Sequence, residues 1–237
     1  MSELDDAREA ALARIGRGLL EAITRALQAF ANGDEGAALR DGFAALTQGV
    51  TPQRSFLARV DGRRRVTEVL VYEGLSDAQV EALRAGTSSP GVSPSLIRAA
   101  LHSGQAQVIE DARLASRRGQ ISGALAGGAY SVVCATVNDP HSRAPVAVLY
   151  LQTSSITQPL TRALAPYIEA YTLALGTAWH VWDRTQQALS KARGERVVRA
   201  MEIVGDSQAT RALRQRVHRG HRQRERAASG AGFTPAQ

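Results

Sequence analysis

The sequence predicts an α+β fold, in which an antiparallel β-sheet of five to six strands is flanked by helices and a long helix lies at each end of the chain. Two observations lead to this prediction. Apolar residues recur every three or four positions near the N-terminus and again after residue 159, which is typical of amphipathic helices. Between them, short apolar runs are bounded by Gly, Pro, Asn and Asp, which is typical of strands and turns.

Two helices are expected at the start of the chain. In residues 3–31 the apolar side chains fall on one helical face, at Leu12, Ile15, Leu19, Ile23, Leu27 and Phe30. Asn32-Gly33-Asp34 ends this helix, because these residues favour turns. A second helix is expected over residues 35–48, ending at Gly49.

A β-hairpin comes next. Residues 54–61 and 63–72 are joined at Asp61-Gly62, and an Asp-Gly pair between two strand-like runs predicts a hairpin turn. Ser76 is a suitable N-cap for the helix that follows. Two short helices are expected after the hairpin, over residues 76–85 and 95–101.

The rest of the sheet precedes the last helix. Three more strands are expected at residues 105–110, 130–137 and 145–152, and the polar, glycine-rich residues 111–128 are expected to be irregular. A long helix should run from Pro159 to about Arg193. Pro166 should kink or restart this helix, because proline lacks the backbone N–H that a helix interior needs.

Composition limits the class of protein. Hydrophobic residues make up 44% of the chain, which is enough for a packed core, and no apolar run approaches the ~20 residues of a membrane span. The first six residues are acidic and polar, unlike a secretory signal. The single cysteine excludes an internal disulfide and argues against a structural zinc site. We therefore expect a cytoplasmic protein with no membrane association, no metal and no cofactor.

The net charge of +7 is unevenly distributed. Residues 1–195 carry 20 Lys and Arg against 19 Asp and Glu, whereas residues 196–237 carry nine Arg against three acids. The nearly neutral body argues against specific DNA binding. The basic tail, residues 218–237, is expected to be disordered and to bind nucleic acid without sequence preference.

The middle of the chain resembles a GAF domain, a small-molecule sensor of GAF/PAS-like fold. Pro145–Gln152 resembles the penultimate strand of that family, although Ala147 replaces the usual Gly. Ser131–Val137 resembles the strand before it, and Ser95–Asp111 resembles the helix and strand ahead of the ligand segment. The resemblance covers about residues 34–189.

A second resemblance lies near the C-terminus. Ile203-Val204-Gly205-Asp206-Ser207 and the residues up to Val217 resemble the segment that leads into the AAA+ domain of sigma-54-dependent transcriptional activators. The chain ends about where the nucleotide-binding loop begins in that family. Lys191 is the only lysine, and Ser190 precedes it where the phosphate-binding motif needs Gly, so no P-loop can form. The resemblance implies a sensory domain that is truncated before its ATPase and DNA-binding domains.

Four segments are expected on this basis. They are an N-terminal amphipathic helix (1–33), a GAF-like sensory domain with its long C-terminal helix (34–193), the AAA+ lead-in (194–217) and the basic tail (218–237).

The resemblance also implies a ligand pocket. GAF-like domains bind ligands between one sheet face and the segment before the fourth strand. By position, the pocket would be lined by Tyr72, Arg98, Arg113, Arg117, Tyr130, Ser131, Cys134 and Thr136. Its three arginines would clamp a carboxylate or phosphate, because guanidinium presents a planar pair of donors. The alternative is that these arginines are solvated surface charges.

No catalytic constellation is found in the sequence. Cys134 lies in an apolar strand, which favours a buried, inert thiol, and the GAF-fold methionine sulfoxide reductases need several cysteines. His218 and His221 lack the further ligands of a zinc site. We therefore expect no enzymatic activity.

The last helix carries a stripe of apolar residues at close to seven-residue intervals, namely Leu160, Leu164, Tyr167, Tyr171, Leu175, Trp182 and Leu189. Such a stripe serves either as a dimer seam or as core packing. We expect a homodimer formed through the terminal helices, with an AAA+ protein as a further partner.

The predicted function is that of a non-enzymatic GAF-type sensor of a sigma-54-dependent regulator, in which an unidentified small ligand changes the setting of the last helix. The alternative is a stand-alone ligand-binding or interaction module whose basic tail contacts nucleic acid.

Overall fold

The computed structural model describes residues 3–87, 91–118, 128–156 and 160–203. The chain divides into two units, residues 1–183 and 184–237, and the whole sheet belongs to the first unit. Most of the AAA+ lead-in, from Val204 onward, lies outside the described residues, as do His218, His221 and the rest of the basic tail.

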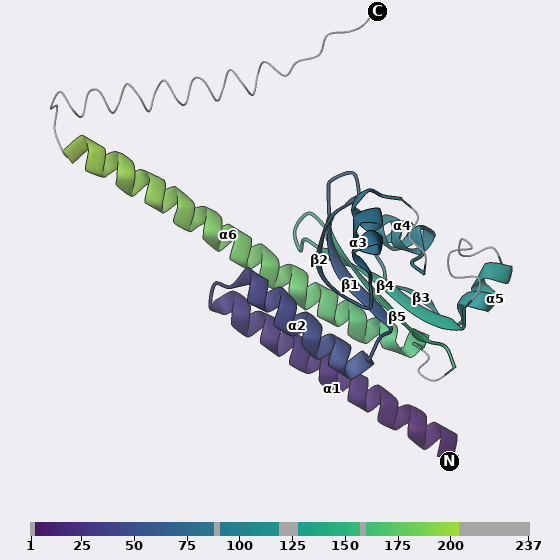
Figure 1. The fold of residues 1–237 in the computed structure, drawn as a ribbon. Helices are drawn as coiled ribbons and strands as arrows, with labels where there is room; N and C mark the ends of the chain where they lie inside the picture. The colour runs from purple at the N-terminus through teal and green to yellow at the C-terminus, as the bar shows by residue number, and fades with distance from the viewer. Residues whose placement is uncertain (1–2, 88–90, 119–127, 157–159, 204–237) are drawn as a thin grey trace, which may run out of the picture. The chain divides into compact units, whose positions relative to one another are not determined.

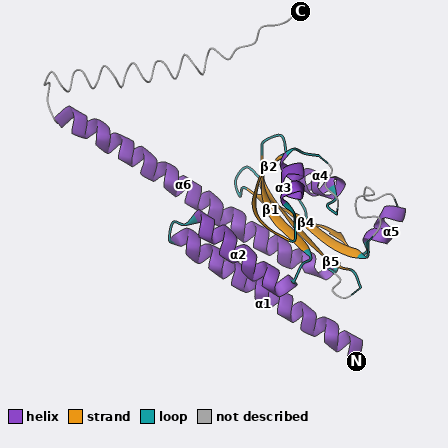
Figure 2. Ribbon diagram, in the orientation of Figure 1, coloured by secondary structure: helices purple, strands orange, loops and turns teal. Residues whose placement is uncertain are grey.

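A five-stranded antiparallel sheet forms the centre of the first unit, with the strand order β2-β1-β5-β4-β3 (Figure 2). Its strands are β1 (Arg54–Val60), β2 (Val66–Glu73), β3 (Gln107–Ile109), β4 (Tyr130–Asn138) and β5 (Pro145–Ser154). The sheet confirms the predicted α+β fold. The pairing of β1 with β2 also confirms the hairpin that was predicted from Asp61-Gly62.

One face of the sheet is covered by α1 (Glu3–Ala31), α2 (Glu35–Val50) and the part of α6 (Ala165–Ile203) that belongs to the first unit (Figure 1). Small residues let α1 and α2 approach closely, because a Cβ on Gly18 would lie 2.8 Å from the Cα of Gly49. Apolar side chains of these helices, such as Leu46 and Ile168, pack with Leu149 of the central strand β5. We call this packed layer the helix-side core.

The opposite face carries α3 (Asp77–Arg84) and α4 (Pro94–Ser103), while α5 (Ala112–Arg117) follows the short edge strand β3 (Figure 1). Apolar side chains of these three helices pack on the sheet around Phe56 and Tyr150, whose rings are stacked with centroids 5.0 Å apart. Ser76 caps α3, as predicted. We call this second layer the groove-side core.

The sequence-based prediction for residues 111–128 was wrong in its first part, which forms α5. The Asp111 side chain starts this helix by accepting a hydrogen bond from the Arg113 backbone N–H at 2.8 Å. Six residues are too few to show a helical repeat of apolar residues, so the periodicity did not reveal α5.

Pro166 restarts the last helix and does not kink it. A 3₁₀ turn over Arg162–Leu164 precedes α6, and Pro166 is the second residue of α6. In the first turn of a helix the backbone N–H has no intrahelical acceptor, so proline costs nothing there. Pro159, the predicted start, lies outside the described residues.

The predicted apolar stripe on the last helix is largely core. Leu160, Leu164, Tyr171 and Leu175 are buried in the helix-side core, and Trp182 packs against it. Tyr167 and Leu189 are exposed.

Candidate functional site

A groove of about 950 Å³ lies on the groove-side face of the sheet. Its walls are the β1–β2 turn, the end of α3 with the residues after it, and α4. Its apolar lining is contributed by Val66, Leu83, Val92, Ile97 and Leu101. This volume is typical of small-molecule sites, which are concave and mostly apolar with a few polar groups.

The β1–β2 turn presents three consecutive arginines to the groove, Arg63, Arg64 and Arg65. One carboxylate organises the turn, since Asp61 Oδ1 accepts the backbone N–H groups of Arg63 and Arg65 at 2.9 Å each. Asp61 Oδ2 also accepts from the Arg65 guanidinium, at 2.9 Å from Nη2 and 3.1 Å from Nε. These donors, the Arg65 backbone first, lower the pKa of Asp61. The carboxylate is thus held by the turn.

Two basic side chains of α4 line the same groove. Arg98 and His102 are one helical turn apart and both line it. Arg64 Nη1 lies 3.4 Å from His102 Nδ1. On the α3 wall, Arg84 forms an ion pair with Glu81 at 2.7 Å.

The structure does not bring the eight predicted pocket residues together, and only Arg98 lines this groove. Tyr72 lies on β2, where its hydroxyl donates to Asp77 at 3.4 Å. Arg113 forms an ion pair with the cap residue Asp111 at 3.2 Å, and Arg117 is exposed at the end of α5.

The four predicted pocket residues of β4 separate onto two faces of the sheet. Cys134 is buried in the groove-side core, with Tyr130 packed against that core. Ser131 points to the opposite side, because successive side chains of a strand alternate. Its Oγ accepts the Leu160 backbone N–H at 2.8 Å. Thr136 is buried and lines a separate pocket of about 280 Å³ near the α6 residues Glu169 and Thr172.

A buried polar network lies behind the groove and was not predicted. Arg54 and Gln152 are opposite each other on β1 and β5. With the Gln152 amide oriented so that both its ends are paired, its oxygen accepts from Arg54 Nη1 at 3.0 Å. Its nitrogen then donates to the Gly91 carbonyl at 2.7 Å and to the Tyr150 hydroxyl at 3.3 Å. This network ties the residues that precede α4 to the middle of the sheet.

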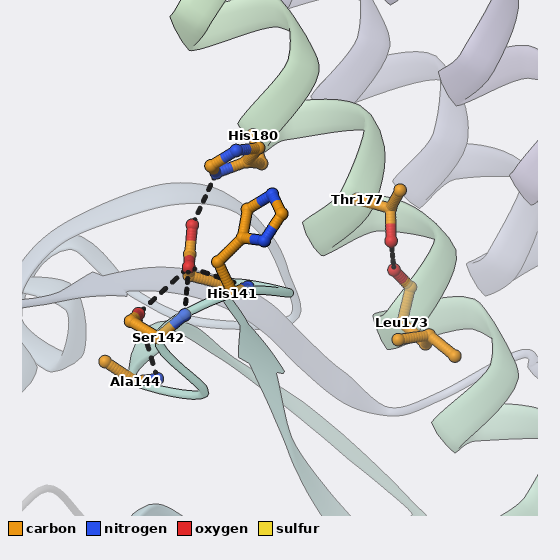
Figure 3. A network of polar contacts seen from close by, with 7 residues as sticks. His141, Ser142, Ala144, Leu173, Thr177 and His180 are labelled. Atoms are coloured by element: carbon orange, nitrogen blue, oxygen red, sulfur yellow. Dashed lines mark hydrogen bonds and ion pairs between the residues drawn. The ribbon is translucent and has the colours of Figure 1, made fainter.

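Helix α6 is joined to the sheet by specific polar contacts near the β4–β5 turn (Figure 3). His180 Nδ1 lies 2.6 Å from Asp139 Oδ2, and the other carboxylate oxygen accepts the Ser142 backbone N–H at 2.7 Å and the His141 N–H at 3.0 Å. These hydrogen bonds, led by that of the Ser142 backbone, lower the pKa of Asp139. One turn before His180, the helix backbone at Gly176 nearly touches the sheet, since a Cβ there would lie 2.3 Å from the Asn138 oxygen.

Cys134 is fully buried, and burial raises the pKa of its thiol, as expected for an inert core cysteine. In the part of the chain that the structure describes, no three His, Cys, Asp or Glu side chains are grouped to hold a metal ion. The described helices include none with the length and apolarity that crossing a membrane requires.

No family model and no curated protein matches the sequence. Among solved structures, the free methionine-R-sulfoxide reductase of Neisseria meningitidis, in complex with its substrate, is 14% identical, with a TM-score of 0.51 over 71% of this chain and 91% of that one. A GAF domain/HD domain protein of Geobacter sulfurreducens is 15% identical, with a TM-score of 0.47 over 68% and 98% of the two chains.

A third similar structure is the GAF domain of a phosphoenolpyruvate-protein phosphotransferase from Acinetobacter. It is 15% identical, with a TM-score of 0.48 over 71% of this chain and 97% of that one. Identities this low bear on the fold alone. The fold, an antiparallel five-stranded sheet flanked by helices, is the α+β arrangement that was predicted.

Proposed function

We propose that this chain is a non-enzymatic, GAF-type sensory domain that binds a small ligand in the groove and reports its presence through α6. The observation that carries the proposal is the placement of the groove and α6 on opposite faces of one sheet, with polar contacts connecting each of them to it. A ligand that binds one arrangement of α4 more tightly would shift the population toward that arrangement.

The connection between the two faces is short. The network of Arg54, Tyr150 and Gln152 holds Gly91, which precedes α4, against β1 and β5. On the opposite face of the sheet, Ser131 of β4 accepts a hydrogen bond from the backbone N–H of Leu160, which precedes α6. A shift of α4 that moved these strands would therefore act on the residues that position α6.

Two features support a binding role over an enzymatic one. The only thiol, Cys134, is buried, so it cannot reach a substrate in the groove. Among the described residues that line the groove, Asp61 has the only carboxylate, and it already accepts hydrogen bonds from backbone and guanidinium donors.

We also propose that the domain serves a sigma-54-dependent regulator and acts on an AAA+ partner. The support is the resemblance of the sequence from Ile203, where α6 ends, to Val217 to the lead-in of that ATPase. ATP hydrolysis by a sigma-54 activator's AAA+ core, measured with and without this chain, is the test. A rate that this chain does not change would contradict the regulatory role.

We further propose that the domain pairs with a second copy through α1 and α6. These helices lie side by side, since a Cβ on Gly16 would lie 3.8 Å from Tyr167 Cε1, and Leu27 and Tyr171 line one small pocket. Apolar side chains along both helices are exposed, namely Leu20, Leu27, Tyr167, Leu173 and Val181. Sedimentation equilibrium should show a dimer that Leu20→Glu with Leu27→Glu dissociates, whereas Leu114→Glu on α5 leaves it intact. A monomeric wild type would refute this pairing.

The sensory proposal is tested by filling the groove. Ala85 lines it, so Ala85→Trp places a large side chain where a ligand would lie. Hydrogen exchange of the α6 amides over residues 168–183 should change in this variant. The matched control is Ala99→Trp, because Ala99 is exposed on α4 but does not line the groove. Unchanged exchange in Ala85→Trp would mean that the groove does not communicate with α6.

A further inference from the structure

The charges that line the groove are strongly unbalanced. Besides the two compensated arginines, Arg65 with Asp61 and Arg84 with Glu81, the groove is lined by Arg63, Arg64, Arg98 and His102. In the ranges that the structure describes, the guanidinium groups of Arg63, Arg64 and Arg98 form no ion pair with a carboxylate. The groove therefore holds several uncompensated positive charges.

Arg64 occupies a position that an arginine does not favour. Its φ is +61°, in the left-handed region where hairpin turns usually place Gly or Asn. The Asp61 carboxylate fixes the residues on both sides of it, so the unfavourable conformation is maintained by the turn. A strained backbone kept in this way suggests that the side chain has a role at this place.

Three basic side chains of the groove converge. Arg98 and His102 lie on one face of α4, one turn apart, and the Arg64 guanidinium reaches His102 Nδ1 at 3.4 Å. Because guanidinium only donates, the contact makes His102 the acceptor. A bound anion would accept hydrogen bonds from both arginines at once. It would also accept a hydrogen bond from the protonated ring nitrogen of His102.

The floor beneath these charges is apolar. Val92 and Leu101 are buried beneath the groove, while Val66 and Pro94 are partly exposed and Ala85 is exposed in its lining. An inorganic ion would leave this surface uncovered, whereas a ligand with an apolar body would cover it. The groove volume of about 950 Å³ accommodates such a body.

We propose that the groove binds an organic anion, whose carboxylate or phosphate group lies between Arg64, Arg98 and His102 and whose apolar body covers Val66 and Pro94. This assignment rests on the proposed sensory function, because it names the chemistry of the ligand that the domain would detect. Arginine suits the role, since its planar fork pairs with two oxygens of a carboxylate or phosphate.

Four small probes separate the contributions of charge and apolar surface. Phenyl phosphate and phenylacetate combine an anionic group with a phenyl ring, benzyl alcohol has the ring without the charge, and inorganic phosphate has the charge without the ring. Calorimetric titration of the full chain at low salt should give tighter binding for one or both organic anions than for the other two probes. Whichever of the two organic anions binds more tightly identifies the phosphate or the carboxylate as the preferred group.

Two variants remove the proposed contacts. Arg98→Gln should weaken binding of the organic anion by about tenfold or more, because a hydrogen bond to a charged group is lost. Arg64→Gly should weaken it similarly while relieving the left-handed backbone, so loss of folding cannot explain the result. Arg17→Gln on α1, which changes the net charge equally but lies on an exposed helix surface outside the groove, should bind like the wild type.

The outcomes distinguish this inference from the sensory function. Equal binding of benzyl alcohol and the anions, or unchanged binding in both groove variants, would overturn the anion assignment and leave a groove that detects an uncharged ligand. No binding of any probe at millimolar concentration would also overturn it. If the organic anion binds as expected but hydrogen exchange of α6 stays unchanged, the anion site stands and the sensory function fails.

Discussion

Replacing Gly176 with alanine tests how closely α6 is seated on β4. A Cβ at this position would lie 2.3 Å from the Asn138 carbonyl oxygen and 3.3 Å from Val137 Cγ1. Ordinary van der Waals contact begins near 3.4 Å, so the helix and the strand would have to separate locally by about 1 Å. The nearest atom belongs to the backbone of a sheet, which cannot rotate aside as a side chain can.

Two effects of opposite sign determine the result. Alanine is favoured over glycine in a helix interior by ~0.8–1.0 kcal/mol, which alone would stabilise the protein. Overpacking of a buried contact costs ~1–3 kcal/mol. The separation would also stretch the hydrogen bond between His180 and Asp139, one helical turn further on. We therefore expect the free energy of unfolding to fall by about 1–2 kcal/mol, which lowers the Tm by about 2–8 °C for a chain of this size.

Differential scanning calorimetry of Gly176→Ala and of Gly16→Ala provides the comparison. Gly16 is also in a helix, but the nearest atom to its Cβ would be Tyr167 Cε1 at 3.8 Å, an ordinary contact. Gly16→Ala should raise the Tm by about 2–4 °C, because only the helix propensity changes. If Gly176→Ala raised the Tm as well, the close seating of α6 on β4 would be refuted.

Three further predictions concern buried or hydrogen-bonded groups. Ser131→Ala leaves the Leu160 N–H without its acceptor and should lower the free energy of unfolding, measured by urea titration, by ~1–3 kcal/mol. Ser55→Ala is the control and should leave the free energy of unfolding unchanged, because the buried Ser55 Oγ has no partner. Equal losses in the two variants would contradict this prediction. The pKa of Asp139 is lowered, chiefly by the Ser142 backbone N–H, so its contribution to stability is present above its ordinary value of 3.8 and is lost as the pH falls below it. When the urea midpoint is measured against pH, Asp139→Asn should lose less stability than the wild type as the pH falls below 3.8. An equal loss of stability at acid pH in the two proteins would contradict this prediction. Burial raises the pKa of the Cys134 thiol, so Ellman's reagent should modify the folded chain no faster than it unfolds, and immediate labelling would show that the thiol is accessible.

The sheet was predictable from the sequence because its signals are local. Asp61-Gly62 between two strand-like runs predicted the β1–β2 hairpin, and the continuous apolar run in β5 matches a strand that is buried on both faces. The restart at Pro166 also follows from a single residue.

The candidate site was less predictable, because it depends on which face each side chain occupies. Ser131 and Cys134 are three residues apart on one strand, so alternation alone places them on opposite faces; assignment by resemblance overlooked this. The pairing of Arg54 with Gln152 depends on the register between β1 and β5, which no local pattern specifies. The convergence of Arg64 with His102 depends on tertiary packing of a turn against a helix.

The alternation of side chains in β4 and β5 has a consequence for how this protein can change. Val148 and Leu149 are neighbours in the sequence, yet one belongs to the groove-side core and the other to the helix-side core. The side chains of the two cores therefore pack independently, and only the backbone of the sheet lies between them. Substitutions in the groove-side core can therefore accumulate over time without requiring compensating changes in the side chains that pack the three long helices.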